Sequence, residues 1–124
     1  MRPLRLLPGD DLRATLEALG STGFVVAGIG SLVRAQIRFA DDAGPTAVDG
    51  PLEILTLCGS LTPDGAHLHA SLSDAAGRVL GGHVCAGCEV RTTAELLIAP
   101  LPPGALGRAF DPATGYPELV IFTS

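Results

Sequence analysis

The chain has no lysine and carries little charge of either sign. All eight basic residues are arginines, against 13 acidic residues, so the net charge is −5 and the isoelectric point is about 4.9. No window of the sequence collects a basic cluster, and nucleic-acid phosphates are neutralised by clustered lysine and arginine. The composition therefore argues against a chain that binds DNA through its bulk electrostatics.

Long apolar runs are also missing. The longest uncharged stretch falls short of the ~20 apolar residues that a membrane-spanning helix needs. The first residues, Met1–Pro8, lack the apolar segment of a secretory signal. We therefore expect no membrane association and a cytoplasmic location. Three cysteines, Cys58, Cys85 and Cys88, do not make a disulfide framework.

The residues that are present are mainly apolar. The chain has 124 residues, of which 47% are hydrophobic and only 17% charged, and its mean hydropathy is +0.40. This length predicts a single domain over residues 1–124, since domains most often run ~100–150 residues. Soluble domains average ~25% charged residues. The low charge thus indicates more apolar surface than one small core needs, and it predicts self-association.

Sixteen glycines and ten prolines divide the chain into many short segments. One helix is expected over Asp11–Leu19, capped by an aspartate and ended by Gly20. Strands are expected over Leu4–Leu7, Phe24–Ile29, Val33–Phe39, Leu52–Cys58, His67–Ser73, Arg78–Cys85, Val90–Ala99 and Leu119–Phe122, with irregular segments at Asp41–Gly50 and Pro100–Gly107. The expected fold class is α+β (an α/β-type sandwich), with a largely antiparallel sheet packed against one or two helices.

The only histidines, His67, His69 and His83, lie on one expected hairpin. His67 and His69 are two residues apart on a strand, so they point to the same face. A three-residue turn ending in Gly77 makes His69 face His83 and His67 face Cys85, with opposed Cβ atoms ~4.5–5.5 Å apart. A turn of two or four residues, or a bulge in the second strand, would send His83 to the other face.

Three imidazoles with an open fourth position are the arrangement of catalytic zinc sites. The sequence therefore predicts that His67, His69 and His83 bind zinc, with Cys85 as a candidate fourth ligand. The alternative is that the three histidines are hydrogen-bonded polar residues at a subunit interface or on the sheet surface.

The spacing Cys85-x-x-Cys88 has its own alternatives. It could be half of a zinc site or a redox pair, but no second CxxC exists and the two cysteines have opposite parity on a strand. Two small, at least partly buried residues are therefore the favoured interpretation. A nucleophile pair of Cys85 and His67 fits the same hairpin register, but no orienting group is evident nearby.

Two glutamates, Glu53 and Glu95, interrupt apolar strands. A buried carboxylate needs a partner, so we expect each to pair with an arginine such as Arg34, Arg78 or Arg91. The alternative is a catalytic role, since a carboxylate beside a metal-bound water can act as a general base.

Several separated motifs occur in an order typical of one family. They are Arg5–Leu12, Gly30-Ser31-Leu32, Gly50-Pro51-Leu52-Glu53-Ile54-Leu55, His67–Asp74, Gly81-Gly82-His83, Thr92-Thr93-Ala94-Glu95 and Asp111–Leu119. With these motifs the chain resembles the PPC domain (plant and prokaryote conserved domain) over nearly its whole length. The resemblance implies an antiparallel sheet packed against helices, assembly as a homotrimer, and a metal site, zinc, at the three histidines.

Plant proteins of this family carry the domain after an AT-hook, and there it mediates self-association and binding to transcription factors through a Gly-Arg-Phe-Glu-Ile-Leu motif. In this chain Pro51 and Leu52 replace the arginine and phenylalanine, and no AT-hook is present. By the resemblance, Glu53 is a candidate for partner binding, and Glu95 lies in a second matching motif.

The sequence thus predicts a homotrimeric PPC-domain protein that binds a metal. The alternative, by family analogy, is a DNA-binding or transcription-regulatory protein. A third hypothesis is a metal-dependent enzyme acting on a small molecule between subunits. The sequence specifies no reaction and no partner other than the chain itself.

Overall fold

The computed structural model describes residues 1–122. It contains eight strands and one helix: β1 (Arg2–Leu6), α1 (Leu12–Ala18), β2 (Gly23–Arg38), β3 (Thr46–Thr62), β4 (Gly65–Ser73), β5 (Val79–Val84), β6 (Glu89–Pro100), β7 (Leu106–Asp111) and β8 (Tyr116–Ile121). α1, the only helix among these residues, is not one that could cross a membrane.

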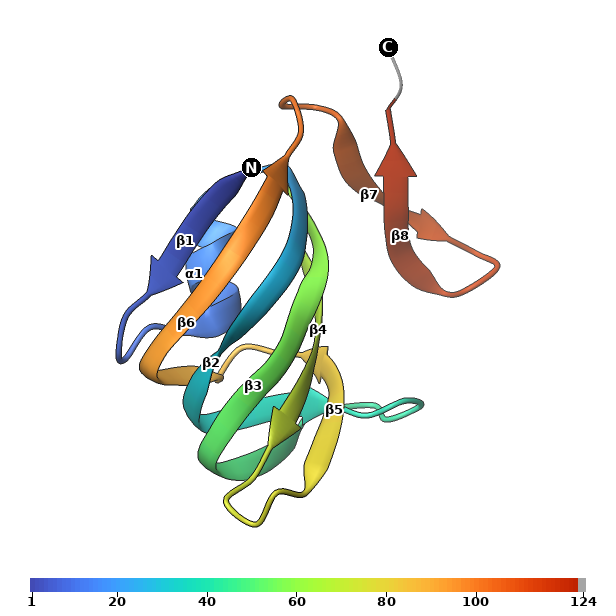
Figure 1. The fold of residues 1–124 in the computed structure, drawn as a ribbon. Coiled ribbons are helices and arrows are strands. Elements are labelled where there is room, and N and C mark those ends of the chain that lie inside the picture. Colours follow the sequence, from blue (N-terminus) through green and yellow to red (C-terminus); the bar gives the residue numbers. More distant parts are fainter. Residues whose placement is uncertain (123–124) are drawn as a thin grey trace.

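Six strands form one antiparallel sheet in the order β1-β6-β2-β3-β4-β5. The sheet curls until β5 also pairs with the end of β2, through Ile37 opposite Val84 and Arg38 opposite His83. β7 and β8 form a separate hairpin that stands away from the sheet (Figure 1). The expected fold class is confirmed, with a single short helix.

The helix begins where the sequence predicts a cap. The Asp11 carboxylate accepts a hydrogen bond from the Ala14 N–H at 2.9 Å, and Gly20 follows the helix with a φ of +65°. Leu12 and Leu16 are fully buried, and α1 lies behind β1 and β6 in Figure 1. The helix therefore covers one face of the curled sheet.

The largest differences from the predicted strands are in β2, β3 and β7, while the ends of the other strands shift by one to three residues. The segments Phe24–Ile29 and Val33–Phe39 are one continuous strand, β2, because register shifts along it keep both parts paired with β6. β3 begins at Thr46, inside the expected loop Asp41–Gly50, and β7 begins inside the expected irregular segment Pro100–Gly107. β7 carries no alternating apolar pattern, so no feature of the sequence indicated a strand there.

The core lies between α1 and the inner face of the sheet and consists of aliphatic side chains from α1 and six strands. The outer face of β2 and β3 keeps four apolar side chains at the surface, namely Phe24, Val26, Ile29 and Leu55. Four more apolar side chains are exposed on the β7–β8 hairpin and on the residue that follows it, namely Phe110, Tyr116, Ile121 and Phe122. The excess of apolar surface expected from the composition is present on these two faces.

Gly59 brings β3 unusually close to β4 beside the first histidine. It lies opposite Leu68, its φ is +154°, and a Cβ added there would collide with the His67 carbonyl oxygen and approach the Leu68 Cα to 2.8 Å. Only a residue without a side chain allows this approach. Gly59 therefore helps to fix the position of the strand that carries His67 and His69.

Replacing Gly59 by alanine should lower the free energy of unfolding by about 1–3 kcal/mol, because the strands must separate and the backbone is strained. Urea unfolding followed by circular dichroism measures this. Gly44→Ala is the matched control, since nothing lies within 4 Å of a Cβ at Gly44. Equal stability of the two variants would show that β3 and β4 separate there without cost.

Candidate metal centre

The β4–β5 hairpin has the turn that the sequence predicts. The Asp74 N–H donates to the Arg78 carbonyl at 2.9 Å, the Gly77 N–H donates to the Asp74 carbonyl at 3.0 Å, and Gly77 has a φ of +80°. The resulting register places His69 directly opposite His83. The predicted three-residue turn and this pairing are confirmed.

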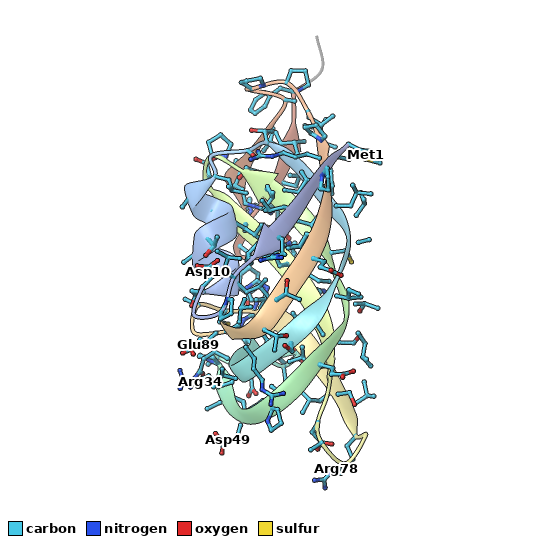
Figure 2. All side chains as sticks on the ribbon, turned by 60° about the vertical axis from the view of Figure 1, so that its left-hand side comes forward. Met1, Asp10, Arg34, Asp49, Arg78 and Glu89 are labelled. Carbon is cyan, nitrogen blue, oxygen red and sulfur yellow. The ribbon has the colours of Figure 1, made fainter. Side chains whose placement is uncertain are left out.

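The Asp74 carboxylate holds the turn in this form. It accepts hydrogen bonds from the backbone N–H groups of Ala76 and Arg78, both at 2.9 Å, and from the Arg78 guanidinium at 3.1 Å. The backbone hydrogen bond from Arg78 is the largest cause that lowers the pKa of Asp74. Arg78 marks the far end of the hairpin in Figure 2.

The three imidazoles converge on one patch. Their ring centroids are 4.9 Å apart for His67 and His69, 5.3 Å for His67 and His83, and 5.9 Å for His69 and His83. The Nε2 atoms of His67 and His69 are 3.2 Å apart. Each residue offers one ligand atom within 4.8 Å of the other two, so the side chains lie as close as the ligands of one ion.

His83 has a ring nitrogen that lacks a partner. Its Nε2 lies 3.4 Å from Nη1 of Arg13, and a guanidinium only donates, so Nε2 acts as the acceptor there. Its Nδ1 is buried and has no hydrogen-bond partner among the described residues. An unpartnered buried polar atom is costly, and a metal ligand is one way to satisfy it. The all-imidazole donor set fits a divalent transition metal such as zinc.

Burial favours the neutral form of two of these rings. It lowers the pKa of His83 to about 4, with the nearby Arg38 as the next cause. Burial is also the main cause that lowers the pKa of His67, followed by the charge of His69. At neutral pH His67 and His83 are therefore unprotonated, which is the form that binds a metal.

These shifts predict that the metal-free protein loses stability on mild acidification. The pKa of His67 and His83 is lower in the folded chain than the usual value of 6.5. The unfolded chain then binds more protons as the pH falls through 6.5, which favours unfolding. Thermal melting of chelator-treated protein should show a falling midpoint between pH 7.5 and 5.

His83→Gln is the matched control, since it removes the group with the larger shift and should flatten this fall. A melting midpoint that stays level from pH 7.5 to 5 in the unsubstituted chain would contradict the assignment of neutral imidazoles at His67 and His83.

Cys85 does not lie where the predicted hairpin put it. β5 ends at Val84, next to β2, so the Cys85 N–H donates to the Gln36 carbonyl at 3.0 Å and its Sγ contacts the His83 carbonyl at 3.8 Å. Across the sheet, His67 faces Ser60 of β3. The expected facing of His67 and Cys85 is therefore wrong, and within residues 1–122 the converging group contains only the three histidines.

The two residues of the CxxC spacing play local structural roles. Both thiols are free. Cys88 is fully buried, accepts a hydrogen bond from the Gln36 N–H at 3.3 Å, and has a pKa raised to about 11 by burial. A thiol with this pKa stays protonated and unreactive.

Glu53 and Glu95 are exposed, so the expectation of buried carboxylates is wrong. Along β3 and β6 they alternate with buried aliphatic neighbours and therefore point outward. Neither forms an ion pair within the described part of the chain, where Arg34 pairs with Glu89 (Figure 2) and Arg78 with Asp74. Neither belongs to the group around the histidines.

Three arginines that no sequence pattern indicated lie beside the histidines. A cavity of about 470 Å³ beside His67 and His83 is lined by Arg13 of α1, Arg38 of β2 and Arg108 of β7. These arginines are far apart in the sequence and belong to no motif. Only the closure of β5 onto β2 and the position of the β7–β8 hairpin bring them together.

Comparisons with known proteins agree with this architecture. The sequence profile of the Plants and Prokaryotes Conserved (PCC) domain matches residues 2–102. A bifunctional protein GlmU from Synechococcus sp. (strain JA-2-3B'a(2-13)) is 48% identical over 124 residues, which cover 96% of this chain and 20% of that protein. The chain therefore spans about a fifth of the length of this curated relative.

Solved structures are similar over almost the whole chain. A hypothetical protein from Salmonella enterica is 37% identical with a TM-score of 0.89, covering 98% of this chain and 92% of its own. A protein from Ralstonia eutropha JMP134, described as a "putative DNA-binding protein", is 25% identical with a TM-score of 0.83 (96% and 90% covered). A protein from Archaeoglobus fulgidus, described as metal-containing, is 27% identical with a TM-score of 0.81 (96% and 91% covered).

Proposed function

The chain belongs to the Plants and Prokaryotes Conserved domain family, and from this premise we propose that it is a homotrimeric protein that binds one zinc ion per chain through His67, His69 and His83. The observation that carries the proposal is the convergence of all three histidines, with a buried ring nitrogen of His83 left without a partner. The metal-containing relative from Archaeoglobus fulgidus supports it.

In this proposal the three imidazoles hold the ion and leave one coordination position open. Zinc bound in this way supplies a Lewis acid and lowers the pKa of a bound water. The protein residues contribute the ligands, their neutral state and the enclosing cavity. This arrangement is compatible with the third hypothesis, a metal-dependent enzyme, for which the cavity beside the histidines is the supporting feature.

Metal content tests the site directly. Untagged protein should carry about one zinc per chain by inductively coupled plasma mass spectrometry, and His69→Ala should lose it while keeping its circular dichroism spectrum, because His69 is exposed. Cys58→Ser is the matched control, since Cys58 lies directly opposite His69 on β3 and should not affect the metal content.

Two results would refute the zinc site. One is unsubstituted protein that stays metal-free after incubation with zinc. The other is His69→Ala with an unchanged zinc content.

The exposed apolar faces support the homotrimer. Ile29 on the outer face of the sheet is 55% exposed, and Phe110 on the hairpin is 69% exposed. An isolated two-stranded hairpin is only marginally stable in water, so β7 and β8 gain from a covering surface. A second copy of the chain presents apolar faces of the same kind.

Light scattering during gel filtration should therefore give about 38 kDa, three times the 12.6 kDa of one chain. Ile29→Glu should lower this mass, because it puts a charge into the apolar face. Val79→Glu is the control, since Val79 is similarly exposed (61%) but lies on β5 next to the hairpin turn. A mass of one chain for the unsubstituted protein would contradict the proposal.

We also propose that residues 1–124 act as one domain, although the family profile ends at residue 102. Arg108 fastens the C-terminal hairpin to the sheet, because its N–H donates to the Asp64 carboxylate at 3.0 Å and its guanidinium donates to Ser60. Leu106 of the same strand is buried.

DNA binding is the second candidate function, and the description of the Ralstonia eutropha relative favours it. The charge of this chain opposes it. A trimer would carry three times −5, and three of the eight arginines face the cavity beside the histidines. Phosphate backbones require a positively charged surface, so the metal-binding proposal agrees better with the charges.

A further inference from the structure

The cavity beside the histidines exists because β5 ends before it reaches the start of β4. β5 pairs with β4 as far as His83 opposite His69, it pairs with β2 at His83 and Val84, and it ends at Val84. Among the described residues the start of β4 has no neighbouring strand on that side, where the Ala66 N–H donates to the Glu17 carboxylate at 3.0 Å, and the gap is lined by Gly65, Ala66 and His67 together with residues from α1, β2 and the β7–β8 hairpin. In Figure 1 this hairpin stands apart from the sheet, on the side of β3 and β4.

Of the three arginines that line the cavity, Arg38 is the one that lies opposite a proposed metal ligand in the sheet. It lies directly opposite His83 in the β2–β5 register, and directly opposed side chains share one face with Cβ atoms ~4.5–5.5 Å apart. It forms no ion pair within residues 1–122. Its guanidinium charge therefore stands next to the metal site without a compensating carboxylate.

Arg13 reaches the same place from α1. Its Nη1 lies 3.4 Å from the His83 Nε2 and donates to the Val84 carbonyl at 3.2 Å. Its Nε is 3.5 Å from a Glu17 carboxylate oxygen, so the charge of Arg13 is partly balanced. Two guanidinium groups thus border the side of His83 that faces the cavity.

Three carboxylates also line the cavity, and none of them forms an ion pair with Arg38. Asp64 accepts the Arg108 N–H and serves to hold the hairpin. Asp41 follows β2 in an exposed turn with a φ of +63°, and Glu118 lies on β8 near His67. Against these three charges stand three arginines, to which a divalent metal adds two positive charges, so the loaded site is net positive.

A divalent cation beside the unpaired Arg38 guanidinium is electrostatically unfavourable unless an anion lies between them. We propose that this cavity binds a small organic molecule through an oxyanion group, a carboxylate or a phosphate, which lies between Arg38 and the metal held by the histidines. This inference rests on the metal site proposed above. Guanidinium groups recognise both oxyanions through charge-assisted hydrogen bonds.

The dimensions and the remaining walls indicate a ligand larger than a bare ion. The volume of about 470 Å³ lies within the ~300–1,000 Å³ range of small-molecule sites. Tyr116 and Pro117 of the hairpin line the cavity and supply an apolar side for the carbon skeleton. A ligand there is bounded by the sheet, the helix and the hairpin at once.

Calorimetry and visible absorption of the cobalt(II)-loaded protein test the proposal, with malonate and inorganic phosphate as separate probes and glycerol as the neutral control. We expect saturable binding of at least one anion, together with a change in the cobalt absorption bands. Arg38→Ala should weaken this binding by about tenfold or more, because a charge-assisted hydrogen bond is lost. Binding of malonate alone would assign a carboxylate, and binding of phosphate alone a phosphate.

Arg34→Ala is the matched control, because Arg34 lies four residues before Arg38 on β2 and is paired with Glu89 at 2.8 Å (Figure 2). It should bind anion as the unsubstituted protein does. Arg38→Gln keeps the three-carbon stem, removes the charge, and replaces Arg38→Ala if that variant does not fold. All titrations use one ionic strength, since screening weakens such contacts.

The two proposals fail in different ways. Cobalt uptake without binding of either anion, or equal anion affinity in Arg38→Ala and the unsubstituted protein, would overturn the oxyanion site and leave the metal site standing. A protein that takes up no cobalt would overturn the metal site and, with it, the ligand proposed here.

Discussion

The turn between β4 and β5 is the constraint on which the histidine site depends. Side chains alternate between the two faces of a strand, so a hairpin shifted by one residue would carry His83 to the opposite face from His67 and His69. Asp74 and Gly77 prevent that shift, since the carboxylate accepts three hydrogen bonds in the turn and the glycine takes the left-handed conformation. The turn at Asp74–Gly77 thus determines whether the three imidazoles lie on the same face of the sheet.

The closure of the sheet then gives this site its surroundings. β5 pairs with β4 as far as His83 and with β2 at His83 and Val84, which brings Arg38 opposite that histidine, and its end at Val84 leaves room next to His67. The helix and the C-terminal hairpin complete the enclosure with Arg13 and Arg108. As a result, three of the eight arginines line the cavity beside His67 and His83, although the chain as a whole carries few charges.

The local parts of this arrangement could be predicted from the sequence, whereas the long-range parts could not. The cap at Asp11 and the turn at Gly77 depend on neighbouring residues, so their chemistry is visible in the sequence. The pairing of β5 with β2 as well as β4 depends on the curl of the whole sheet, and it places Cys85 beside Gln36 instead of in the predicted position opposite His67. Glu53 and Glu95 were expected to be buried because their neighbours are apolar, but strand alternation turns them outward.

X-ray absorption at the zinc edge of the purified, zinc-loaded protein decides whether the three histidines hold the ion, because it reports the atoms bound to the metal. A site of His67, His69 and His83 should give three imidazole nitrogens at ~2.0–2.1 Å and no sulfur. A sulfur scatterer at ~2.3 Å would assign the metal to a cysteine, and fewer than three imidazoles would separate the histidines. Either result would contradict a site built by His67, His69 and His83.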